Sequence, residues 1–89
     1  MKGIISVIGK DNIGIIANIC SFLAENNINI LEISQHIVGG YFNMTMIVDI
    51  SKVDNRFSQV IEDIEQIGKK IGLEIKMQRT DIFDIMHRI

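Results

Sequence analysis

The residues Gly9 to Gly14, GKDNIG, join two apolar runs and place a cation, a carboxylate and an amide between two glycines. The spacing matches the first half of a phosphate-binding loop, but Ile15 and Ile16 replace the lysine and hydroxyl residue that should follow. A calcium loop needs alternating oxygen ligands and a distal glutamate, and Asp11 and Asn12 supply only a fragment of that pattern. The sequence therefore argues against nucleotide hydrolysis and against calcium binding at this loop.

Two interpretations of the loop remain open. In the first, Asp11 or Asn12 caps a helix and Gly14 allows a close approach of helix and sheet, so that the loop is purely structural. In the second, the free amides at the helix start bind a carboxylate while Asp11 or Asn12 accepts a hydrogen bond from an ammonium group. Because an amino acid carries both charges on one carbon, the second interpretation predicts an amino-acid site.

The other reactive side chains do not form a catalytic group. Cys20 has apolar neighbours inside a predicted helix, where an inert thiol is expected. His36 falls on the open face of a predicted hairpin, and His87 has no nucleophile beside it. Met44 and Met46 belong to the apolar face of a strand and predict core packing rather than a copper site. We therefore expect a protein that is not an enzyme and that uses no cofactor or metal.

The composition favours one domain spanning residues 1–89. Apolar residues make up 47% of the chain, so part of the apolar surface is expected to be buried between copies. The net charge of −2 predicts no attraction to nucleic acid or to a membrane surface, and no apolar run has the length of a membrane span. We see no signal peptide, and the single cysteine excludes an internal disulfide and fits a cytoplasmic protein.

Hydrophobic periodicity predicts alternating strands and helices. The predicted order is strand 3–8, helix 13–26, a hairpin centred on Gly39-Gly40, a second helix that Asp54 or Asn55 caps and Gly72 ends, strand 73–79, and a short tail helix over 80–89 that Thr80 or Asp81 caps. This β-α-β-β-α-β order is that of an α+β, ferredoxin-like fold, a four-stranded antiparallel sheet with two helices on one face. The opposite face lacks cover, and a second copy is its simplest partner.

The Gly-Gly turn also predicts the hairpin register. It pairs Leu31 with Val48, Ile33 with Met46, Gln35 with Met44 and Ile37 with Phe42 on a face that we expect to lie in the core. Glu32 with Ile47, Ser34 with Thr45 and His36 with Asn43 then lie on the more open face. A slip of one residue would mix the two faces, so this register is strongly specified.

Almost the whole chain resembles the ACT domain family. The segment ISVIGKDNIGIIANICSFLAENNINILEISQ is similar to the family's opening strand, Gly-x-Asp-x-x-Gly-Ile loop, helix and second strand. The segments YFNMTMIVDIS and DIFDIMHRI resemble a subgroup of small stand-alone proteins related to the regulatory domain of the glycine-cleavage repressor. Many members carry a proline before the last loop glycine, where this chain has Ile13.

The resemblance implies a regulatory module that binds an amino acid or a related metabolite at a homodimer or higher homo-oligomer interface and modulates a partner protein. It also implies a site in which the second strand of one chain completes the loop of its neighbour. Transferred position by position, the ligand-binding residues are Lys10, Asp11, Asn12, Ile13, Gly14 and Ile15 of the loop, with Asn29, Ile30, Leu31 and Glu32 of the strand.

The alternative is a structural protein–protein interaction module without a small-molecule ligand. The tail stripe of Ile82, Ile85, Met86 and Ile89 supports that alternative, because so short a helix must dock on its own sheet, a sister chain or a client. Two enzymatic or nucleic-acid functions of the same fold are disfavoured. An acylphosphatase needs a loop arginine, and RNA recognition needs exposed aromatic residues on the central strands; the first strand has none.

Overall fold

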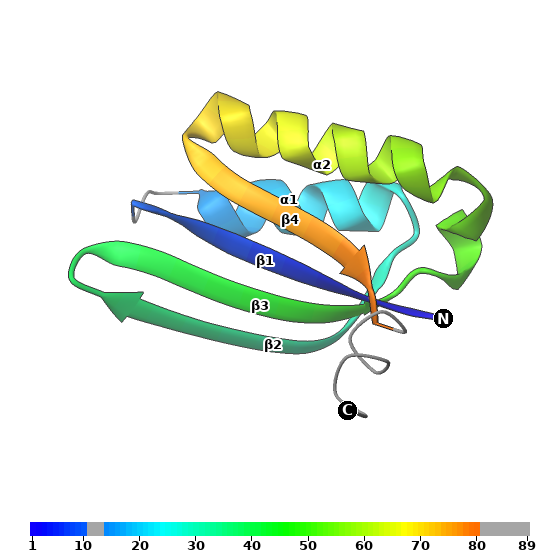
Figure 1. The fold of residues 1–89 in the computed structure, drawn as a ribbon, viewed down its shortest axis with the longest axis horizontal. Helices are drawn as coiled ribbons and strands as arrows, with labels where there is room; N and C mark the ends of the chain where they lie inside the picture. The colour runs from blue at the N-terminus through cyan, green and yellow to red at the C-terminus, as the bar shows by residue number, and fades with distance from the viewer. Residues whose placement is uncertain (11–13, 81–89) are drawn as a thin grey trace, which may run out of the picture.

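The structure, a computed structural model, describes residues 1–10 and 14–80. Its elements are β1 (Lys2–Lys10), α1 (Ile15–Glu25), β2 (Asn29–Val38), β3 (Tyr41–Asp49), a 3-10 helix η1 (Ser51–Arg56), α2 (Phe57–Ile71) and β4 (Leu73–Arg79). The strands form one antiparallel sheet in the order β2-β3-β1-β4. Both helices lie on the same side of this sheet (Figure 1), which confirms the predicted ferredoxin-like α+β fold. The predicted tail helix falls almost wholly on residues 81–89, outside the described residues.

The first helix begins later than its sequence pattern predicts. The residue preceding it is Gly14, in the left-handed conformation with φ 85°, and the helix starts at Ile15. The helix thus starts two residues later than predicted, with Gly14 at the N-cap position. The predicted capping residues Asp11 and Asn12 lie outside the described residues. The predicted stop is confirmed, since Asn26 holds the C-terminal cap position and Asn27 follows with a positive φ of 57°.

The second helix also starts elsewhere than predicted. Asp54 and Asn55 lie within η1, and Arg56 takes the cap position of α2 without a side-chain cap, so the predicted cap is wrong. The 3-10 helix η1 forms here because Val53 is buried and packs this segment against the core. The predicted end is confirmed: Gly72 adopts φ 75°, a left-handed conformation that glycine accepts without a Cβ clash.

The hairpin register is confirmed along most of its length. Pairing runs as predicted from Val38 opposite Tyr41 to Glu32 opposite Ile47. The predicted partner of Leu31 is wrong, because the register shifts between Ile30 and Glu32 and Val48 instead faces Ile30. A bulge adds one residue to one strand, and strand periodicity does not reveal it.

The two strands of the hairpin differ sharply in burial. On β3, the side chains of Phe42, Met44, Met46 and Val48 are at most 5% exposed and join the core. On β2, Leu31, Ile33 and Ile37 are 43%, 49% and 62% exposed, so the prediction that they lie in the core is wrong. The reason is position: β2 is an edge strand, and the helices cover the rest of the sheet rather than β2 (Figure 1).

Candidate functional site

The predicted site falls into two parts at opposite ends of the sheet. Lys10, at the end of β1, pairs with Tyr41 beside the hairpin turn. Asn29, at the start of β2, pairs with Asp49, which in turn pairs with Lys2 at the beginning of β1. The nine residues of β1 separate the two ends by about 25 Å, at roughly 3.3 Å per residue (Figure 1). One protomer therefore does not bring the predicted ligand-binding residues together.

The loop part ends at the first turn of α1. The side chain and the backbone amide of Asn18 both donate to the carbonyl oxygen of Gly14, each at 2.9 Å. Ile15 is buried and anchors the helix start in the core, while Lys10 is exposed. Within the described residues no side chain caps this helix end, which leaves first-turn amides facing outward with the positive end of the helix dipole. Asp11, Asn12 and Ile13 lie outside the described residues, so their roles stay predictions.

The strand part lies on the open edge of the sheet. Asn29, Leu31 and Glu32 are exposed and Ile30 is half-buried. Further along the same face, the hydroxyl of Ser34 lies 3.4 Å from the Nε2 atom of His36. These side chains offer a carboxylate, an amide, a hydroxyl and a histidine to a partner on the edge.

A polar pocket near the start of β2 escaped the sequence analysis. Its volume is about 350 Å³, and its lining residues are Asn27, Asn29, Asp49, Ser51 and Lys52. The hydroxyl and the backbone amide of Ser51 donate to one oxygen of Asp49, at 2.6 and 2.9 Å. These bonds, the hydroxyl's first, lower the pKa of Asp49 below its ordinary value. One oxygen of the carboxylate is thus already occupied, and the described residues hold no cluster of three potential metal ligands.

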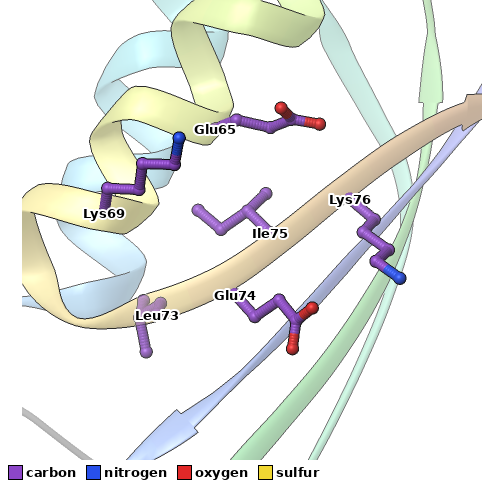
Figure 2. Close-up of a pocket in the computed structure, with 6 residues that line it drawn as sticks. All are labelled: Glu65, Lys69, Leu73, Glu74, Ile75 and Lys76. Carbon is purple, nitrogen blue, oxygen red and sulfur yellow. The ribbon is translucent and has the colours of Figure 1, made fainter.

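A second pocket, of about 320 Å³, lies along the free edge of β4 (Figure 2). Helix α2 contributes Glu65 and Lys69, and β4 contributes Leu73, Glu74, Ile75 and Lys76. The sequence alone does not reveal this pocket, because the closeness of the α2 charges to β4 depends on tertiary packing.

No helix within the described ranges has the length and apolar character needed to span a bilayer.

Comparison with known proteins bears directly on the family. Residues 3–78 match the ACT domain family. A UPF0237 protein from Bifidobacterium longum (strain NCC 2705) is 49% identical over 88 residues, which cover 99% of this chain and 98% of that protein. The solved structure of an ACT domain protein from Streptococcus pneumoniae superposes with a TM-score of 0.83 at 36% identity, covering 93% of each chain.

A more distant solved structure shares the fold. A structure assigned as a glycine cleavage system transcriptional repressor superposes with a TM-score of 0.74, covering 89% of this chain and 45% of that one. At 21% identity, this similarity concerns the fold alone. The family match and the relative of the same length confirm the ACT-domain resemblance drawn from the sequence.

Proposed function

Because the chain belongs to the ACT domain family, whose members are regulatory modules that bind small molecules, we propose that it is a non-catalytic regulator. In this proposal, an amino acid binds between two copies of the chain and the resulting dimer modulates a partner protein. The proposal assigns the ligand to the loop of one copy and to the start of β2 of the other.

The observation that carries the proposal is the separation of the two site halves across the sheet. Val38 ends β2 opposite Tyr41, which is also the partner of Lys10, so β2 ends where the loop begins. A second β2 that pairs antiparallel with the first therefore starts at the loop end of its neighbour. The exposed edge of β2 supplies the surface for this pairing, and a two-fold axis then creates two equivalent sites.

The chemistry of the two halves suits a zwitterion. The amides after Gly14, which no side chain among residues 1–10 and 14–80 caps, attract a carboxylate, because an α-helix start carries a partial positive charge. The exposed carboxylate of Glu32, from the second copy, lies on the face of the sheet opposite the helices, so it favours the ammonium group through its negative charge rather than by direct contact. The predicted acceptors of the ammonium group are Asp11 and Asn12. Each group is at the surface, so affinity depends on the enclosure that the second copy provides.

Regulation follows by linkage. A ligand held by both copies stabilises the dimer geometry in which the two halves meet, by the difference of its affinities for the alternative geometries. A partner protein that binds one geometry more tightly then responds to the ligand concentration. Reciprocity requires that the same partner changes the affinity for the ligand by the same factor.

Isothermal titration of the folded dimer against the twenty amino acids tests the ligand. We expect one amino acid or a chemically related group to bind, with binding lost in Gly14→Val and weakened in Glu32→Gln. Glu62→Gln, which changes an exposed carboxylate on α2, serves as the matched control. A folded dimer that binds none of them at millimolar concentration would argue for a structural module instead.

Mixing the two variants tests whether the site is shared between copies. In a mixed dimer of Gly14→Val and Glu32→Gln, one site has both unaltered halves and the other has neither. Random exchange should then restore about a quarter of the sites in an equimolar mixture. A site contained within one chain would not recover at all, and that result would overturn the shared site.

One specific observation keeps the structural interaction module as the second candidate. Five apolar side chains of β2 and β3 are at least 43% exposed, namely Leu31, Ile33, Ile37, Val38 and Tyr41. A surface of this kind favours association even without a ligand. An unchanged sedimentation coefficient in the presence of every amino acid, with no heat of binding, would favour this second function.

A further inference from the structure

The groove along β4 is lined by residues of both layers of the fold, the helix α2 and the strand β4. Within the described residues β4 pairs with β1 along one side, and its other side is an edge of the sheet. We call the six residues that line this groove the β4 edge, which consists of Glu65, Lys69, Leu73, Glu74, Ile75 and Lys76. The edge presents backbone donors and acceptors that another strand can pair with.

Ile75 lies at the centre of the β4 edge, among the charged residues of both the strand and the helix. Along the strand, Glu74 precedes it and Lys76 follows it, and both point to the open face of the sheet. On the helix side, α2 approaches so closely that a Cβ at Gly68 would lie 2.9 Å from Ile75 Cγ1. Figure 2 shows Glu65 and Lys69 reaching from the helix on one side of β4, with Glu74 and Lys76 on the other.

This arrangement is complementary to itself. If two β4 strands pair antiparallel with Ile75 opposite Ile75, Glu74 of each copy faces Lys76 of the other. A shift that centres the axis on Glu74 or on Lys76 instead sets like charges opposite each other, which is unfavourable. Sliding one strand past the other by a single residue would set side chains of the open face opposite side chains of the helix-covered face. Among the registers centred on residues 74–76, the charges therefore favour the one centred on Ile75.

The same two-fold axis also relates the charged residues of α2 in the two copies. Glu65 and Lys69 lie on either side of Ile75 along the strand direction, as Figure 2 shows. A rotation about Ile75 consequently brings Glu65 of one copy toward Lys69 of the other. Four opposite-charge contacts then surround one axis, two in each layer. A charged edge is often a device that prevents pairing, but a device of that kind does not need complementary signs in two layers.

We propose that a second copy of this chain binds at the β4 edge, antiparallel, with Ile75 on the two-fold axis and the sheet continuing from one copy into the other. This contact goes beyond the proposed amino-acid site and does not depend on it, because β2 and β4 are opposite edges of the sheet. Where copies also pair through β2, the β4 contact joins such dimers into larger assemblies.

Sedimentation velocity of the full chain at several concentrations tests the contact. Glu74→Lys sets lysines opposite each other at both ends of the pairing, and Lys76→Glu does the same with glutamates. We expect each variant alone to weaken association at this edge at least tenfold. An equimolar mixture of the two should recover the wild-type assembly, because every facing pair in the mixed complex is again of opposite charge.

Matched controls separate this register from a general effect of charge. Glu62→Lys and Lys70→Glu make the same changes in net charge at exposed positions of α2 outside the groove, and both should associate like the wild type. Urea unfolding should show that all four variants are folded. The proposal is overturned if Glu74→Lys and Lys76→Glu assemble like the wild type, or if their mixture behaves like either variant alone.

Titration with amino acids keeps this result apart from the proposed function. Glu74→Lys should retain the ligand affinity of the wild type, since the β4 edge is not part of that site. An assembly that loses one step on Glu74→Lys while no amino acid binds supports the β4 contact and counts only against the amino-acid site.

Discussion

Replacing Gly68 by alanine sets two effects against each other. Glycine in a helix interior is less favourable than alanine by about 1 kcal/mol, so propensity alone predicts a more stable protein. The added Cβ, however, would lie 2.9 Å from the carbonyl oxygen of Leu73, 2.9 Å from Ile75 Cγ1 and 3.1 Å from Ile75 Cδ1. A backbone oxygen cannot rotate away, so α2 must move off β4.

The balance predicts a less stable protein. Overpacking of this kind costs about 1–3 kcal/mol. A middle value, reduced by the gain in propensity, leaves a net loss of about 1 kcal/mol, which lowers the Tm of a domain of this size by roughly 4–8 °C. Because a displaced α2 also carries Glu65 and Lys69 away from the β4 edge, the proposed association through that edge should weaken in the same variant.

Urea unfolding and thermal melting at one fixed protein concentration measure the effect, since association makes the Tm depend on concentration. Gln66→Ala, at an exposed position of the same helix, is the control and should stay within about 0.5 kcal/mol of the wild type. Shortening Ile75 to valine should cost less in the Gly68→Ala background than alone, because it removes one of the contacts. A Gly68→Ala protein more stable than the wild type would refute the reasoning.

Four further substitutions give outcomes of known sign. Gly14→Ala, at φ 85°, should destabilise the fold by about 1–2 kcal/mol in urea unfolding, because a Cβ is unfavourable in the left-handed region. Asp49→Asn should lower the Tm at pH 7; because folding lowers the pKa of Asp49, the difference from the wild type should disappear as the pH falls below its ordinary value of 3.8 and through the folded pKa. Asp54→Asn removes a 2.7 Å ion pair with Arg79 between partly exposed side chains and should cost less than about 1 kcal/mol, an effect that salt abolishes. Arg79→Ala should cost more, in a salt-resistant way, because the guanidinium also lies 4.9 Å from the ring centroid of Phe57.

The sequence was sufficient to predict the elements whose burial pattern is local. The strand Leu73–Arg79 alternates buried and exposed side chains from Leu73 to Gln78, as the alternation of apolar and polar residues in its sequence predicts. The stripe of α2 and its end at Gly72 are likewise visible in the sequence. The Gly-Gly turn gave the hairpin register because both glycines have positive φ, 58° and 84°, a combination that the two-residue turn requires.

What the sequence did not predict depends on contacts between distant segments. Ile33 and Ile37 share a face with core residues of β3, but periodicity does not say that the helices stop short of β2. The β4 groove arises because Gly68 lets α2 approach Ile75, which no local pattern reveals. Of the candidate site, the sequence predicted the loop and strand residues, while their separation across the sheet required the fold.

The two edges of the sheet differ in chemistry, and this difference separates their roles experimentally. The β2 edge exposes apolar side chains such as Ile33 and Ile37, and apolar association is not screened by salt. The β4 edge relies on opposite charges at the surface, and these contacts weaken as the Debye length falls from about 10 Å at 0.1 M to about 3 Å at 1 M. If both proposed contacts form, raising the salt concentration should therefore weaken the β4 contact first and leave copies paired through β2, with the proposed amino-acid site between them intact. If salt instead separated the chains completely while ligand binding persisted, the site would lie within one copy and β2 would have no part in it.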